Sequence, residues 1–223
     1  NVASEWAGKS ADVSNDEASL MGYFIAEGSI NSEKAWCFTN GDDDTIQHFR
    51  SLLVSAFKYS TAYVYTKVGT TCQEVSACNA SMRTRLRLLG LKASVAHTKT
   101  VPESIWNSTE AAVCSYLRAY FEGDGTVAIE RIRYRKNRKC AVACYTVSKQ
   151  LALDTQQLLL NLGIECSIVP SKSRHFGTGG LPFNDRHLSY SIRIYGRNIL
   201  KYAEKIGFNS LRKRRALQEC VDI

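Results

Sequence analysis

The spacing of apolar residues predicts the same order of elements twice along the chain of 223 residues. Apolar positions three and four apart predict helices, and short alternating runs between turn residues predict strands. The predicted helices cover residues 15–26, 42–57, 82–89, 108–124, 149–162, 198–206 and 211–220. The predicted strands cover residues 34–39, 62–68, 71–77, 126–134, 140–147, 164–173 and 188–195. We interpret each half as helix, two strands, helix, two strands, helix, although residues 34–39 are the one strand located between the first two helices of the first half.

This order predicts an α+β fold of two pseudo-symmetric αββαββα repeats that pack through their first helices. We expect residues 1–105 to form the first repeat with its linker, around Pro102, and residues 106–223 to form the second. Each repeat supplies an antiparallel sheet that needs one buried face. The other face of each sheet is then open to a ligand.

The first helix of each repeat carries the same pattern of small residues, in segments 20–28 and 117–125. The small residues are four positions apart, Gly22 and Ala26 in the first copy and Ala119 and Gly123 in the second. Residues at that spacing lie on one face of a helix. Two such bare stripes allow the backbones of the two helices to approach closely.

Each copy ends in an acid followed by glycine, Glu27–Gly28 and Asp124–Gly125, and the two acids are 97 residues apart. One copy alone is more simply a capped core helix with an exposed acid. Two copies at domain spacing predict paired carboxylates, which are suitable ligands for a hard divalent metal. We assign the metal site to these four residues and expect both glycines to be left-handed helix ends. Glu122, about 200° around the helix from Asp124, is interpreted either as a structural acid or as an acid that supports a residue of the site.

Residues 20–28 read Leu-Met-Gly-Tyr-Phe-Ile-Ala-Glu-Gly and resemble the motif of the LAGLIDADG homing endonucleases. The second copy keeps four positions of that motif and has Ala119 at the usual first glycine; the residues kept are Leu117, Gly123, Asp124 and Gly125. Residues 99–105 resemble the segment before the second motif of intein-type members. Residues 206–213 resemble their C-terminal segment.

The resemblance covers about residues 15–220 and implies metal-dependent hydrolysis of double-stranded DNA. It implies catalytic acids at Glu27 and Asp124, with Mg²⁺ as the cofactor and Mn²⁺ or Ca²⁺ able to occupy the same sites. By the same resemblance, Lys99 and Lys213 are candidate catalytic lysines that would stabilise negative charge on the phosphorane. Either lysine could instead contact phosphate without joining catalysis.

Composition agrees with a nucleic-acid partner. The formal net charge of +8 and a pI near 9.1 favour an anionic partner, although a basic soluble protein would show the same values. No apolar run approaches the ~20 residues of a membrane span, and no signal peptide is visible after Asn1. The eight cysteines include no Cys-x-x-Cys pair, so we expect no structural zinc site. An even number of cysteines in a chain this long, without a secretion signal, fits reduced thiols in an intracellular protein. By the resemblance, that protein would act on genomic or organellar DNA.

The hairpin after the second motif is the strongest candidate for DNA contact. Period-two alternation places its arginines on one face, and Arg can bind guanine in the major groove in a bidentate way. The predicted DNA contacts in the second half are Arg131, Arg133, Arg135, Lys136, Arg138, Lys139, Lys172, Arg174 and Arg193. Those in the first half are Tyr63, Tyr65 and Lys67. A solvated hairpin charged against aggregation is the alternative. Two unlike halves predict a monomer with a long, asymmetric target.

Three functions fit this pattern. The first is a site-specific DNA endonuclease, and the second is a non-cleaving nucleic-acid binder such as an intron maturase or transcription regulator. Loss of the paired acids would mark the second, but both acids are present. The third is a complete splicing element, which needs Cys or Ser at residue 1 and a C-terminal His-Asn pair. Asn1 and Asp222-Ile223 supply neither, so we expect an endonuclease associated with an intron or intein, or a free-standing one.

Overall fold

The computed structural model describes residues 13–30, 34–66, 68–131, 138–172 and 188–222, and it contains two α+β repeats. The first repeat contains α1 (Asn15–Glu27), β1 (Gly28–Ser29), β2 (Trp36–Asn40), α2 (Asp43–Phe57), β3 (Tyr63–Thr66), β4 (Gln73–Ala77) and α3 (Ala80–Leu88). Its strands form one antiparallel sheet in the order β1-β2-β4-β3.

The second repeat has the same order of elements. It contains α5 (Glu110–Asp124), β5 (Gly125–Arg131), β6 (Arg138–Thr146), α6 (Lys149–Asn161), β7 (Ser167–Lys172), β8 (Leu188–Tyr195), α7 (Arg197–Lys205) and a further helix α8 (Leu211–Val221). Its antiparallel sheet has the order β5-β6-β8-β7. The short elements η1 (Ala96–Thr98) and α4 (Glu103–Trp106) join the repeats. The predicted fold class is confirmed, and the division at residues 105 and 106 stays a prediction.

The two motif helices begin at local capping signals. Ser14 caps α1, its Oγ accepting from the Glu17 amide at 3.2 Å while the Glu17 carboxylate accepts from the Ser14 amide at 2.9 Å. Thr109 caps α5 by accepting from the Ala112 amide at 3.3 Å. The start of each motif helix is therefore specified locally, by residues at most three positions apart in the sequence.

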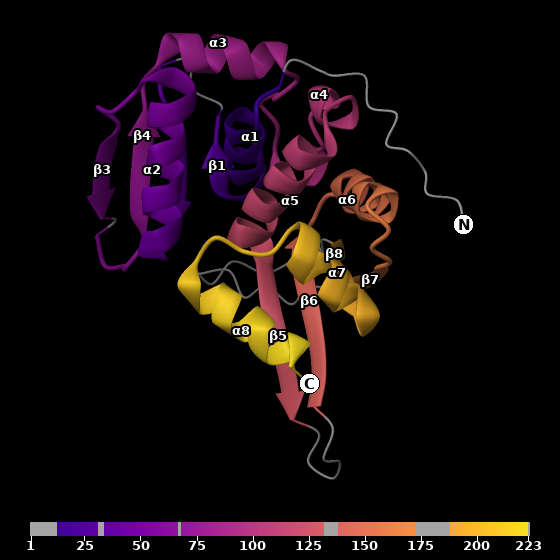
Figure 1. The fold of residues 1–223 in the computed structure, drawn as a ribbon. Coiled ribbons are helices and arrows are strands. Elements are labelled where there is room, and N and C mark those ends of the chain that lie inside the picture. The colour runs from indigo at the N-terminus through magenta and orange to yellow at the C-terminus, as the bar shows by residue number, and fades with distance from the viewer. Residues whose placement is uncertain (1–12, 31–33, 67, 132–137, 173–187, 223) are drawn as a thin grey trace.

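Helices α1 and α5 lie side by side at the junction of the repeats (Figure 1), with their small residues in contact. A Cβ atom on Gly22 would overlap the Tyr116 carbonyl oxygen and lie 2.9 Å from the Ala119 Cβ. A Cβ atom on Gly123 would overlap the Ala26 Cβ. The predicted stripes of small residues are thus confirmed as the interface of the two helices.

Gly28 and Gly125 differ from the prediction, because neither is left-handed. Gly28 has φ −88° and ψ 147°, and Gly125 has φ −98° and ψ 162°, which is extended backbone. Each glycine starts a strand, and a Cβ there would overlap the carbonyl oxygen of Phe24 or Phe121 four residues earlier. Glycine is required at both positions by close approach and not by positive φ.

Each sheet packs one face on helices and leaves the other outside. In the first repeat Phe38 stacks on Phe49 at 4.5 Å, and both rings contact Tyr23. In the second, the fully buried Ile192 and Ile194 of β8 belong to the core with Tyr202. The described cysteines are free thiols, as predicted. Among the described residues, no helix has the length and apolar character that a membrane crossing needs.

Candidate active site at the ends of the paired motif helices

The last residues of α1 and α5 are the two predicted acids. Gly123 allows them to lie together, because it has no side chain on the face that meets Glu27. A Cβ atom on residue 123 would lie 3.3 Å from the Glu27 Cγ. Glu27 is exposed and Asp124 is partly exposed. Burial and the neighbouring Glu27 charge raise the pKa of Asp124 to about 7, while Lys99 and Lys213 oppose that shift. The two carboxylates, one from each repeat, therefore interact with each other.

The two predicted lysines lie at the carboxyl ends of the same helices. The Lys99 Nζ donates to the carbonyl oxygens of Ile25 at 2.7 Å and Ala26 at 3.2 Å. The Lys213 Nζ donates to the carbonyl oxygen of Phe121 at 3.2 Å and to that of Glu122. Each ammonium thus neutralises the partial negative charge at a helix end. Burial lowers the pKa of both lysines.

Each lysine is carried by a segment whose backbone is held by the opposite repeat. Near the first lysine, the Lys99 carbonyl accepts from Ser148 Oγ at 2.6 Å, and Ser148 caps α6. Near the second, the Leu211 amide donates to Asp44 of α2 at 2.9 Å. The four candidate catalytic residues are therefore brought together by contacts that cross between the repeats in both directions.

The carboxylate pair fits a hard divalent cation. Among the described residues, no group of three or more His, Cys, Asp or Glu could hold a metal. Mg²⁺ needs only one or two carboxylates beside water and substrate oxygens. A cation between Glu27 and Asp124 would also relieve the repulsion that raises the pKa of Asp124. The roles of Gly28 and Gly125 in metal binding stay predictions.

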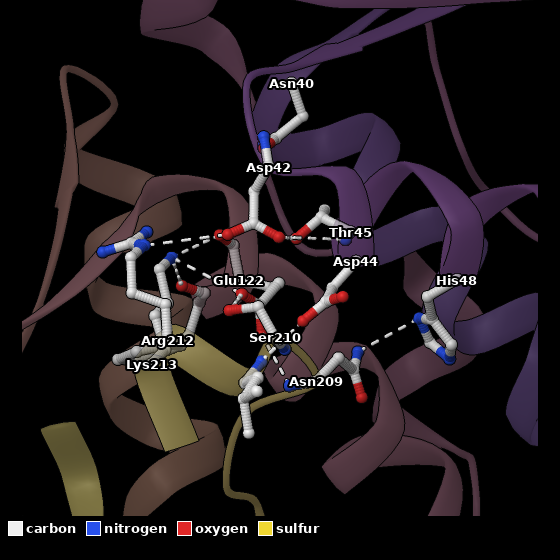
Figure 2. A network of polar contacts seen from close by, with 12 residues as sticks. Asn40, Asp42, Asp44, Thr45, His48, Glu122, Asn209, Ser210, Arg212 and Lys213 are labelled. Carbon is white, nitrogen blue, oxygen red and sulfur yellow. Dashed lines mark hydrogen bonds and ion pairs between the residues drawn. The ribbon is translucent and has the colours of Figure 1, made fainter. Parts of the chain in front are cut away.

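Glu122 has the structural role expected of it (Figure 2). The residue is 2% exposed, and its carboxylate accepts from the Asn209 backbone amide at 2.6 Å, the Ser210 backbone amide at 3.2 Å and Ser210 Oγ at 2.6 Å. Ser210 is the N-cap residue of α8. The carboxylate therefore satisfies amides at the start of that helix, where negative charge is favourable.

The same network extends into the first repeat, a connection that sequence reasoning missed. Asn209 Nδ2 donates to Tyr23 Oη at 3.0 Å and to His48 Nδ1 at 3.1 Å. Arg212 pairs with Asp42, the N-cap of α2, at 3.6 Å. An Asn-Ser pair before a helix is a local start signal, but its partners in the first repeat lie more than 160 residues away.

The outer faces of the sheets carry the predicted DNA contacts that the structure places. Tyr63 and Tyr65 are 67% and 38% exposed as residues, and their ring centroids are 5.7 Å apart. Arg193 donates from Nε to Ser191 Oγ at 2.9 Å and from Nη1 to Tyr195 Oη at 3.4 Å. Lys67, Arg133, Arg135, Lys136 and Arg174 lie outside the described residues, as do the side chains of Arg131, Arg138, Lys139 and Lys172.

A hollow of about 700 Å³ opens at the end of β8, lined by Ala141, Arg193 and Tyr195 together with residues of α7 and α8 such as Leu200 and Cys220. Neither Glu27 nor Asp124 lines it. The carboxylate pair therefore lies apart from this hollow.

Comparisons with known proteins agree with this architecture. Residues 111–207 match the LAGLIDADG-like domain family. The chain is similar in structure to I-DmoI in complex with DNA and Ca, with a TM-score of 0.60 and 16% identity over 94% of this chain and 100% of the other. It is also similar to full-length DUF199/WhiA from Thermatoga maritima, with a TM-score of 0.53 and 14% identity over 95% of this chain and 62% of that protein.

Curated proteins with similar sequence are much longer than the matched segment. A DNA gyrase protein of Mycobacterium kansasii is 31% identical over 66% of this chain and 26% of its own length. The replicative DNA helicase DnaB of Rhodothermus marinus is 34% identical over 61% and 13%. The replication factor C small subunit of Methanocaldococcus jannaschii is 26% identical over 95% and 10%. The chain thus spans about a quarter or less of these three relatives.

The paired motif helices, the two sheets and the family match define a protein of the two-repeat LAGLIDADG class. Residues 111–207, which form most of the second repeat, match the LAGLIDADG-like domain family, and the chain as a whole has a fold similar to that of I-DmoI.

Proposed function

We propose that this chain is a site-specific endonuclease that hydrolyses double-stranded DNA with divalent metal. The observation that carries the proposal is the meeting of Glu27 and Asp124, one from each repeat, at the ends of α1 and α5. Each carboxylate would hold metal and ionise fully once a cation offsets their repulsion. When bound, the divalent cation supplies Lewis-acid stabilisation of the charge that develops on the phosphoryl group.

The remaining residues would position the duplex and balance its charge. Lys99 places an ammonium beside both acids, which supports a role in stabilising negative charge during phosphoryl transfer. The basic hairpin at 131–139, the tyrosines of β3 and Arg193 of β8 would contact the two halves of a long target. Because the two outer faces carry different residues, the target would be asymmetric, and one chain with both repeats would act as a monomer.

The relatives support the proposal that the coding sequence of this chain is carried within, or beside, the gene of another protein. Segments similar to this chain occur within a gyrase protein, a replicative helicase and a replication factor, proteins that differ in name and in role. I-DmoI is itself described as a homing endonuclease. An endonuclease that spreads its own coding sequence, within an intein or an intron, would account for this distribution. The protein would then act on genomic or organellar DNA inside the cell.

A non-cleaving DNA-binding protein on the same scaffold is the second candidate. The likeness to DUF199/WhiA, which covers 95% of this chain, favours it. The presence of both paired acids favours cleavage.

Cleavage selection on a randomised duplex library with Mg²⁺ distinguishes the two candidates. We expect recovery of one long, non-palindromic sequence cut in both strands, with Mn²⁺ able to replace Mg²⁺. A parallel selection for binding in Ca²⁺ provides the control. Recovery of a bound sequence that is never cut with any of these metals would establish the non-cleaving alternative.

A further inference from the structure

The outer face of the first sheet carries an acid on an inner strand. Residues that pair across β2, β4 and β3 lie on the same face of the sheet, and Phe38 and Val75 lie on the buried one. The outer positions of these three strands are Cys37, Thr39, Tyr63, Tyr65, Glu74 and Ser76. Glu74 is the charged residue among them, and it is partly exposed. A face that would meet a polyanion therefore presents a negative charge.

The Glu74 carboxylate is oriented by side chains of the two neighbouring strands. Thr39 Oγ1 of β2 donates to Glu74 Oε2 at 3.2 Å, and Tyr65 Oη of β3 donates to Glu74 Oε1. The hydrogen bond to this carboxylate raises the pKa of Tyr65 to about 12, so the phenol remains a donor at neutral pH. A carboxylate has about four acceptor sites, more than these two donors use. The acid is therefore fixed in direction on the outer face and can accept a further hydrogen bond.

The equivalent strand of the second sheet carries the opposite charge. Strand pairing counted from the two motif glycines makes Glu74 of β4 equivalent to Ser191 of β8, and Ser76 equivalent to Arg193. One outer face thus has a carboxylate where the other has a hydroxyl, and a hydroxyl where the other has a guanidinium. The first face presents a charged acceptor and the second a charged donor.

A carboxylate that lies against DNA needs a hydrogen-bond donor. It is repelled by phosphates, and its desolvation without a donor is costly. In the major groove, the donors are the N4 amino group of cytosine and the N6 amino group of adenine. Adenine places its N7 acceptor beside the amino group, where it would face the second carboxylate oxygen, whereas cytosine places its C5–H edge there. Cytosine is therefore the base that suits a fixed carboxylate.

We propose that Glu74 is a specificity-determining residue, which selects cytosine in the half of the target that meets the first repeat by accepting from the N4 amino group. The inference rests on the proposed function, in which the outer sheet faces contact DNA. Thr39 and Tyr65 are positioning residues, because they act on the base through the carboxylate that they orient. The face of the second repeat selects differently, because Arg193 is a donor.

Selection for binding in Ca²⁺ on a randomised duplex library tests the proposal without cleavage. For wild type, we expect one position of the first half-site at which cytosine is preferred at least about fivefold over every other base. Glu74→Gln is expected to change that preference to adenine and to leave the other positions unchanged, because a glutamine amide pairs with adenine N6 and N7. Arg193→Ala marks the half-site of the second repeat. Glu110→Gln, at the start of α5, is the matched loss of one acid and should change no preference.

Three outcomes would count against the inference. Unchanged preferences in Glu74→Gln would overturn it and leave the proposed function standing. Changes spread over many positions would also overturn it, because they would mean that Glu74 acts only by supporting Tyr65 and Thr39. If wild type selects no sequence at all, the proposed site-specific function fails, and this inference fails with it.

A measurement on wild type decides the matter if Glu74→Gln does not fold. Each cytosine of the selected duplex is replaced in turn by N4-methylcytosine, which keeps Watson–Crick pairing but puts a methyl group in place of the groove donor. Affinity in Ca²⁺ should fall at least about fivefold at one cytosine outside the half-site that Arg193→Ala marks. 5-Methylcytosine is the control, because it adds the same group and keeps the donor. Equal effects of the two methyl groups at every cytosine would overturn the proposal.

Discussion

Gly22 of α1 lies directly against the backbone of Tyr116 in α5, so closely that a Cβ atom at residue 22 would overlap the Tyr116 carbonyl oxygen. The same contact is repeated further along the pair, where Gly123 faces Ala26. Because the helices approach this closely, their last residues, Glu27 and Asp124, can share one site. The helix interface and the candidate active site are therefore a single structural feature.

The first prediction concerns this contact. Gly22→Ala should destabilise the protein by about 1–3 kcal/mol, because the added methyl group forces the two backbones apart. Gly41→Ala is the matched control, since a Cβ there would have only the Cys72 Sγ nearby, at 3.7 Å. Thermal unfolding of both variants measures the difference. Equal melting temperatures for the two would contradict the close packing of α1 and α5.

The second prediction concerns the acids. Glu27→Gln and Asp124→Asn should each reduce cleavage by at least about hundredfold while target binding persists, because each removes an anionic metal ligand but keeps the shape of the side chain. Glu110→Gln serves as a control and should retain cleavage, because this carboxylate is in the first turn of α5, at the opposite end of the helix from Asp124, and pairs with Lys205 at 2.8 Å. Normal cutting by both active-site variants would show that the acids are misassigned.

The third prediction concerns pH and His48. Burial lowers the pKa of His48 below its ordinary value of 6.5, and its Nδ1 accepts from Asn209 Nδ2. The unfolded state then binds a proton at His48 more readily than the folded state does. This contribution to the free energy of unfolding is fully present above pH 6.5, and it is lost as the pH falls through 6.5 towards the lowered pKa.

His48→Gln lacks this titration. The melting temperature of wild type should fall relative to that of the variant between about pH 7.5 and pH 5, measured on both proteins in the same buffers. A constant difference across this range would mean that His48 does not titrate between the folded and unfolded states.

The fourth prediction concerns the outer face of the second sheet. Arg193→Ala should weaken target binding by about 1–3 kcal/mol if the guanidinium contacts a base, and should reduce the salt dependence if it contacts phosphate. Lys201→Ala is the control of equal charge, because Lys201 is on α7 and donates to the Gly163 carbonyl at 2.7 Å. Similar losses for both variants would indicate a general effect of net charge.

Local sequence signals predicted most of the fold. The small residues of both motifs, the caps at Ser14 and Thr109 and the period-two strands act within a few residues, so most elements could be located close to their observed ends. The duplication at 97 residues predicted which helices would pack and which acids would meet. The left-handed glycines were wrong, because Gly28 and Gly125 continue directly into strands.

By itself, then, the sequence determined the repeated elements, the small-residue interface and the pair of acids, since these depend on periodicity and on matching patterns in both halves. Only the tertiary structure decided how the two lysines differ. Glu122 is 91 residues before Lys213 in the chain, and the ammonium reaches it because residues 209–212 are anchored on the first repeat through Tyr23, Asp42 and Asp44. Contacts between distant segments set burial and charge pairing, and no local pattern encodes them.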